Sequence, residues 1–151
     1  MDMENNLTQT MELNTQTNHN LKTQADTVIY FIERLDIDMV DAFLDNKKTY
    51  QDFEKSKFIK KFGIAFDEFI NSGDTFLNKY SGFCNAEICN YKCKGFSFIG
   101  NSSKNYFDLI IDIEDGVVQD IYECTQFKSR TSKMLKAKQI EIDKLQYPFG
   151  V

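Results

Sequence analysis

The chain has 151 residues, a length typical of one domain and enough to bury a hydrophobic core without disulfides or metals. Hydrophobic residues make up 42% of it, with 14 phenylalanines and no tryptophan, which excludes a chain that is disordered throughout. The chain is acidic, with a formal net charge of −5, which argues against nucleic acid or an anionic membrane as the partner.

No apolar run is long enough to span a membrane, and residues 1–20 lack the basic and apolar parts of an export signal. We therefore expect a cytoplasmic protein whose four cysteines are reduced thiols. Residues 1–22 are rich in Asn, Thr and Gln and predict a disordered polar tail, followed by a single α+β domain over residues 23–151. The only histidine, His19, lies in this tail, where its side chain would not be held in the fixed position that catalysis needs.

The first part of the domain predicts helices. Apolar residues from Val28 to Leu35 recur at helical spacing, and a short second helix is expected over residues 39–44 with Asp38 as its N-cap. Thr49 is the expected N-cap of a long third helix that runs to Asn71, with Asp52 completing a capping box. Only the loop of residues 45–48 then separates the second and third helices.

After Gly73 the apolar pattern changes to a period of two, which predicts strands at residues 75–83, 93–99, 106–114, 117–127 and 139–145. Asp115-Gly116 is a strong signal for a two-residue hairpin turn. The predicted fold class is α+β, with N-terminal helices, one of them long, packed on a curved antiparallel sheet of four or five strands.

The turn at Asp115-Gly116 sets the expected register of its hairpin. It pairs Ile113 with Val118, Ile111 with Asp120 and Leu109 with Tyr122. One face should then pack on the long helix, and the other should meet water or a partner. The expected inner face carries Phe107, Leu109, Ile111, Ile113, Val118, Tyr122 and Cys124.

Asp120 is the one residue that interrupts this apolar face. A carboxylate next to a core is costly unless it is paired, and its pKa tends to rise. Asp120, Tyr122 and Tyr50 are therefore candidate residues of a small ligand pocket between the long helix and the sheet. The alternative is that Asp120 lies near the sheet rim, wet or paired with a lysine.

The order of elements resembles the NTF2-like (cystatin-like) superfamily, through the Phe-rich helix from Tyr50 to Asn71 and the strands through Ile113 and Val118. The resemblance covers residues 23–145 and implies a cone-shaped fold with an internal pocket. NTF2-like domains usually have a β-hairpin before the long helix, where this sequence predicts only a loop. The superfamily contains isomerases, dehydratases and non-catalytic binding domains, and in its isomerases an aspartate base works with a tyrosine or acid donor.

The second sheet face suggests an interface, because apolar residues are rimmed by carboxylates. Its candidate residues are Asp108, Ile110, Asp112, Ile121 and Glu123. The expected partner is a second copy of the chain or a basic protein, and the alternative is an ordinary wet sheet face.

Four cysteines, Cys84, Cys89, Cys93 and Cys124, would suit a structural zinc ion. Their spacing is not that of a zinc knuckle, so buried thiols or a redox role remain open. The loop from Gly100 to Asn105 has backbone N–H groups that would suit an anion, although any tight hairpin loop has this composition. Residues 128–144 carry six basic residues, which suit either an acidic partner or a protected edge strand.

Two functions from different classes follow. The first is a non-enzymatic binding or interaction module, without a cofactor, that uses the outer sheet face or a small pocket. The second is a small isomerase-, dehydratase- or hydrolase-type enzyme with Asp120 as general base and Tyr122 as donor. The sequence offers no activated nucleophile, which favours the first.

Overall fold

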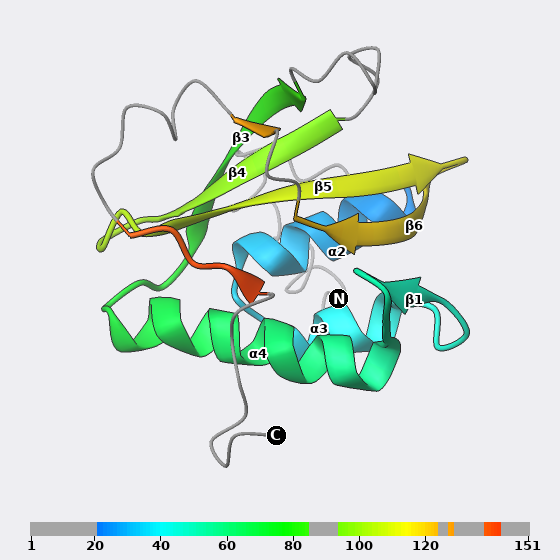
Figure 1. The fold of residues 1–151 in the computed structure, drawn as a ribbon, viewed down its shortest axis with the longest axis horizontal. Coiled ribbons are helices and arrows are strands. Elements are labelled where there is room, and N and C mark those ends of the chain that lie inside the picture. Colours follow the sequence, from blue (N-terminus) through cyan, green and yellow to red (C-terminus); the bar gives the residue numbers. More distant parts are fainter. Residues whose placement is uncertain (1–20, 85–93, 124–126, 129–137, 143–151) are drawn as a thin grey trace, which may run out of the picture.

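The computed structural model describes residues 21–84, 94–123, 127–128 and 138–142. Within these residues the helices form one layer and an antiparallel sheet forms the other (Figure 1). This arrangement confirms the α+β class predicted from the change of apolar period. No helix in the described part of the chain is long and apolar enough to cross a lipid bilayer.

The first two helices begin at side-chain caps. In α2 (Gln24–Glu33), Thr23 Oγ1 accepts a hydrogen bond from the backbone N–H of Asp26. In α3 (Ile37–Phe43), the Asp36 carboxylate accepts one from Met39 N at 3.2 Å, so the expected cap at Asp38 is wrong by two residues. An N-cap residue lies just before the helix, and its side chain accepts a hydrogen bond from the backbone N–H three residues further along the chain. Asp36 meets both conditions.

A short hairpin precedes the long helix. Its strands are β1 (Thr49–Tyr50) and β2 (Phe53–Glu54), and α4 (Lys55–Asn71) follows directly. The predicted capping box at Thr49 and Asp52 is therefore wrong, and so is the prediction that only a loop separates the helices. Gln51 and Asp52 both have left-handed backbone angles, with φ of 52° and 65°, which close a two-residue turn instead of starting a helix.

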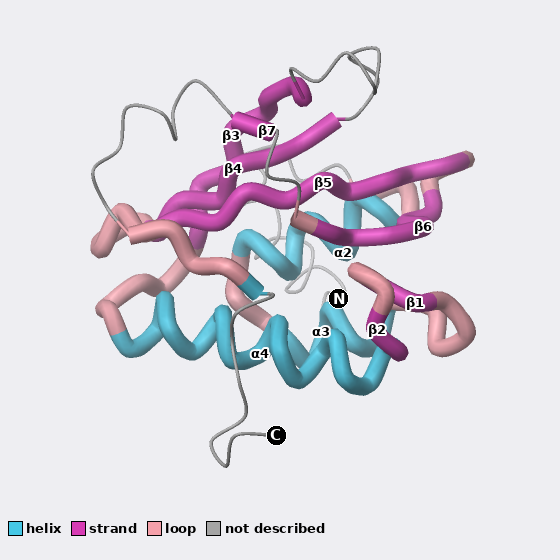
Figure 2. Tube along the Cα trace, viewed as in Figure 1, coloured by secondary structure: helices cyan, strands magenta, loops and turns pink. Residues whose placement is uncertain are grey.

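The main sheet has the strand order β6-β5-β4-β3-β7 (Figure 2). Its strands are β3 (Leu77–Cys84), β4 (Lys94–Gly100), β5 (Tyr106–Glu114), β6 (Val117–Tyr122) and β7 (Phe127–Lys128). The single strand predicted over 117–127 is wrong, because β6 ends at Tyr122 and β7 pairs with β3 at the other side of the sheet. Of the strand predicted at 139–145, the described residues show one parallel bridge, between Tyr106 and Gln139.

A β-bulge shifts the register of the best-predicted hairpin. Ile113 pairs with Val118 as expected, but Ile111 then pairs with Ile121 instead of Asp120. The extra residue in β6 allows both Val118 and Ile121 to reach the core, where neither side chain is exposed. The predicted pairs of Ile111 with Asp120 and of Leu109 with Tyr122 are wrong for this reason.

Aromatic side chains fill the space between the helix layer and the sheet. Phe107 of β5 lies 5.7 Å from Phe62 and 5.2 Å from Phe69 of α4, measured between ring centroids, and 5.6 Å from Phe98 of β4. All four side chains are fully buried. Ile140 and Ile142, close to the end of the chain, belong to the same cluster. Any ligand site has to lie outside this packed interior.

Candidate functional site

Asp120, the predicted floor of a pocket, holds the β1–β2 turn against β6. Its Oδ1 accepts hydrogen bonds from Gln51 N at 2.9 Å and from Ile121 N at 2.8 Å. Burial raises the pKa of this half-buried carboxyl, the two hydrogen bonds lower it, and the carboxylates of Asp52 and Asp112 raise it again. The net effect is a raised pKa, as the sequence predicts. Asp120 does not lie on the predicted inner face of the sheet, however.

Gln51 and Glu123 complete this contact. The Gln51 side chain donates to Glu123 Oε1 and accepts from Glu123 N, both at 3.1 Å. Glu123 Oε2 accepts from Ile142 N at 2.7 Å. The polar groups around Asp120 therefore join the hairpin, β6 and the segment at residues 138–142.

Of the two candidate tyrosines, Tyr50 directs its hydroxyl at Asp45 and not at Asp120. Tyr50 is fully buried, and its hydroxyl donates to Asp45 O at 3.3 Å and accepts from Asp45 N at 3.1 Å. Burial raises its pKa to about 12. Tyr122 pairs across the strands with Ile110 and follows Asp120 by two residues, so these two side chains lie on the same face of β6, opposite to Ile121. The three predicted pocket residues thus lie near one another without enclosing a cavity in the described part of the chain.

The predicted interface is wrong in its centre. Asp108 and Ile110 are buried within the single chain, at 4% and 2% exposed, and the Asp108 carboxylate accepts a hydrogen bond from the Ser97 hydroxyl. Ile121 lies on the opposite face because of the bulge. Of the five candidates, Asp112 is exposed and Glu123 is half-buried in the contacts described above. Among the described residues, Ile110 and Ile121 therefore offer no exposed apolar centre to a second copy or a basic partner.

The metal hypothesis falls mostly outside the described residues. Cys89, Cys93 and Cys124 are not among them, and Cys84 is described only by its backbone at the end of β3. The described residues hold no cluster of three or more metal-binding side chains. Of the basic stretch at 128–144, Lys138 is described, and its ammonium lies 3.3 Å from Glu68 Oε1. The zinc hypothesis stays a prediction.

The loop from Gly100 to Asn105 does hold an anion, and that anion is the chain's own Asp74. Asp74 Oδ1 accepts from Ser102 N and Ser103 N, both at 2.7 Å, and Oδ2 accepts from the Ser103 hydroxyl at 2.5 Å. The carboxylate is only 3% exposed. The sequence left open an anion site or an ordinary tight hairpin loop, and in the structure the backbone N–H groups of the loop connect the end of α4 to the β4–β5 turn through Asp74.

An open groove of about 560 Å³ lies where the end of α3, the β1–β2 hairpin and the start of α4 meet. It is lined by Asp41, Asn46, Lys47, Lys48, Thr49, Glu54, Lys55, Ser56, Ile59 and Lys60. None of these residues is predicted from the sequence to bind a ligand. A usable signal was present, since residues 47–61 contain six lysines against Asp52 and Glu54.

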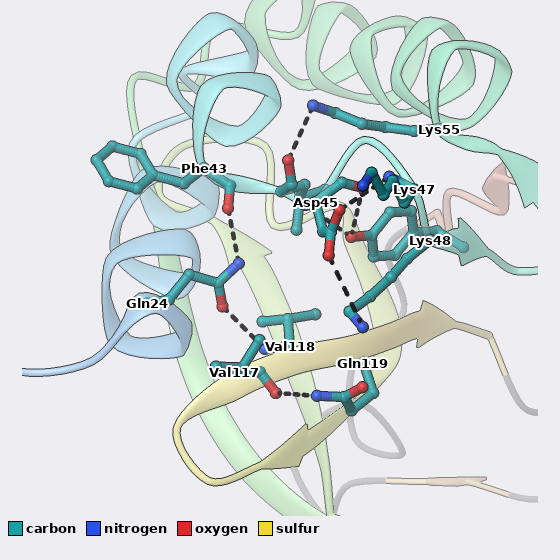
Figure 3. Close-up of polar contacts among 11 residues, drawn as sticks. Gln24, Phe43, Asp45, Lys47, Lys48, Lys55, Val117, Val118 and Gln119 are labelled. Atoms are coloured by element: carbon teal, nitrogen blue, oxygen red, sulfur yellow. Dashed lines mark hydrogen bonds and ion pairs between the residues drawn. The ribbon is translucent and has the colours of Figure 1, made fainter.

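Lys55 forms the base of the groove and clamps its two sides together. Its buried ammonium donates to Asp41 O at 2.6 Å, to Leu44 O at 2.9 Å and to Asn46 Oδ1 at 2.6 Å. It also lies 3.1 Å from Asp41 Oδ1. Figure 3 shows Lys55 reaching from α4 over the connection that carries Asp45, Lys47 and Lys48. A cation at the C-terminal end of α3 satisfies carbonyl groups that the helix leaves without partners.

The groove is electropositive in an acidic protein. Four lysines against the carboxylates of Asp41 and Glu54 leave its lining with a formal charge of +2. The N-terminal end of α4 has no side-chain cap and no acidic residue in its first turn, and the backbone N–H groups there add partial positive charge. The groove therefore favours negatively charged ligands.

Comparison of the chain with family models, with curated proteins and with solved structures finds no match.

Proposed function

We propose that this protein is a cytoplasmic, non-enzymatic binding module whose ligand site is the groove between the end of α3, the β1–β2 hairpin and the start of α4. The observation that carries the proposal is the groove itself, an open volume of about 560 Å³ held in shape by Lys55. Buried aromatic side chains lie between α4 and the sheet, which favours the groove over the predicted site between helix and sheet.

The contacts of Asp120 support binding over catalysis. Asp120 Oδ1 accepts two backbone hydrogen bonds, which stabilise the charged carboxylate and so weaken it as a base. Tyr50, the third candidate pocket residue, is hydrogen-bonded to Asp45. One observation favours the alternative of an isomerase-type enzyme, namely that burial raises the pKa of Asp120.

The NTF2-like architecture remains part of the proposal. The hairpin from Thr49 to Glu54 lies directly before the long helix, where the superfamily usually has one, and helices come before an antiparallel meander. These features support the resemblance more fully than the order of predicted elements did. The resemblance concerns architecture and does not choose a ligand.

A blocked-groove variant tests the proposed function. Ser56 is exposed at the start of α4 and lines the groove, so Ser56→Trp should fill part of it without disturbing the core. We expect compounds from a chemically diverse library to raise the melting temperature of the wild type and to lose that effect in Ser56→Trp. Hits that stabilise both proteins equally would contradict binding in the groove.

The matched control is Ser81→Trp, which places the same bulky side chain at another exposed serine, on β3. It should respond to the hits as the wild type does. The proposal involves no cofactor. Elemental analysis of protein purified without a chelator tests the alternative of a structural zinc ion, which would appear as one metal per chain and as a loss of stability on chelation.

A further inference from the structure

Seven of the ten residues that line the groove have side-chain hydrogen-bond donors. Lys47 and Lys48 come from the connection between α3 and β1, Thr49 from β1, and Ser56 and Lys60 from the first two turns of α4. Ile59 is the one large apolar residue among the lining residues. Binding here must therefore depend on charge and donated hydrogen bonds and much less on apolar contact.

The carboxylates of Asp41 and Glu54 offset only two of the four lysines that line the groove. The Asp41 carboxylate is engaged by Lys55, with 3.1 Å between Oδ1 and Nζ. Among the described residues, the ammonium of Lys48 has one ion pair, with Asp45 Oδ2 at 3.9 Å, which is beyond hydrogen-bond distance (Figure 3). Its ammonium would gain a closer partner by turning toward an anionic ligand.

Asn46 is oriented by the same clamp. Its Oδ1 accepts from Lys55 Nζ at 2.6 Å, so the amide nitrogen, the donor end of the group, is directed away from that ammonium. Lys55 thus acts as a positioning residue. Its ammonium occupies three acceptors, the carbonyl oxygens of Asp41 and Leu44 and the amide oxygen of Asn46.

We propose that the groove binds a small ligand through a phosphate group or a similar multiply charged oxyanion. The inference rests on the proposed function and names its ligand class. Ammonium, hydroxyl and amide donors are the partners that phosphate oxygens take. A small ligand fits better than a polyanion, because a long anionic chain would meet the rest of a protein whose net charge is −5.

Titration of the isotope-labelled full chain with sodium pyrophosphate, followed by NMR at low ionic strength, tests this inference. We expect saturable shifts in the amides of residues 46–49 and 54–60 beyond those caused by sodium chloride of equal ionic strength. In Lys47→Gln/Lys48→Gln the dissociation constant should rise about tenfold, because two charges are lost. Lys47→Arg/Lys48→Arg should bind within about threefold of the wild type.

The matched control is Lys22→Gln/Lys104→Gln, which removes the same charge at two exposed lysines outside the groove and should bind as the wild type does. An equal loss in both double variants would overturn the inference, since only net charge would then matter. The absence of saturable shifts would overturn it as well. Groove-dependent hits that are not oxyanions, found with the Ser56→Trp pair, would leave the proposed function standing while this ligand class fails.

Discussion

A methyl group at position 100 would lie in the place of the Asp74 carboxylate. A Cβ built on Gly100 comes 2.1 Å from Asp74 Oδ2, and that carboxylate has nowhere to move because three hydrogen bonds hold it in the loop. We expect Gly100→Ala to lower the free energy of unfolding by about 3 kcal/mol, measured by urea denaturation.

Substitution of Gly63 should have the opposite effect on the free energy of unfolding. It lies in α4, and a Cβ there would make an ordinary contact, 3.5 Å from Ile37 Cγ1. Gly63→Ala should raise the free energy of unfolding by about 0.5–1 kcal/mol through helix propensity. Equal effects of the two substitutions would show that the approach between Gly100 and Asp74 is not as close as described.

Asp120 provides a pH-dependent prediction. Because its pKa is raised in the folded chain, the folded state binds the proton more tightly than the unfolded state does. The contribution of Asp120 to stability is therefore largest below the ordinary carboxyl pKa and falls as pH rises through the folded value. We expect the carboxyl carbon of Asp120, followed by NMR, to titrate above an unperturbed aspartate; an ordinary midpoint would also count against the general-base alternative.

Substitution separates the charge of Asp120 from its hydrogen bonds. Asp120→Asn keeps an oxygen that can accept from Gln51 N and Ile121 N, and it removes the repulsion from Asp52 and Asp112. At neutral pH it should unfold at the same urea concentration as the wild type or a higher one. Asp120→Ala loses both hydrogen bonds and should cost about 1–3 kcal/mol. A large loss in Asp120→Asn would mean that the charge itself stabilises the turn.

At the scale of elements, Lys55 joins the end of α3 to the start of α4. Lys55→Met keeps most of the apolar stem but leaves the carbonyls of Asp41 and Leu44 without their donor. We expect a loss of about 2–3 kcal/mol in the free energy of unfolding, measured by urea denaturation. Lys57→Met, at an exposed position two residues further along α4, should stay within about 0.5 kcal/mol of the wild type.

The β1–β2 hairpin shows why this element was missed from sequence. Its turn residues, Gln51 and Asp52, adopt left-handed angles that each cost about 1 kcal/mol for residues other than glycine. The Asn-Gly or Asp-Gly signal is absent, and Thr49 with Asp52 imitates a capping box. The contacts of Gln51 with Asp120 and Glu123 offset the strain, and both partners lie about 70 residues away in the sequence.

At the scale of the molecule, one aromatic cluster connects the helix layer to the sheet. Phe107 of β5 packs against three other phenylalanine rings, two of them on α4. Phe107→Ala should therefore lower the free energy of unfolding by about 3–5 kcal/mol. Phe76→Ala removes a side chain that is 43% exposed and should cost under about 1 kcal/mol in the same urea experiment. Similar costs would mean that the two layers are held mainly by other contacts.

Local patterns in the sequence predict the fold class, the order of helices and strands, the Asp115-Gly116 turn and the second pair beyond it, Ile113 with Val118. These depend on local signals, namely apolar spacing and residues that tolerate left-handed backbone. It also indicated that the loop from Gly100 to Asn105 suits an anion, because that property belongs to its own backbone.

The positions of Asp120 and of the groove depend on contacts between distant segments, so they could not be predicted from local patterns. The bulge in β6 moved Ile121 into the core and Asp120 out of it, because burying an isoleucine is favourable and burying an unpaired carboxylate is not. The groove likewise exists only where α3, β1, β2 and α4 meet. No single segment contains it, since its shape depends on Lys55 reaching carbonyls that are distant from it in the chain.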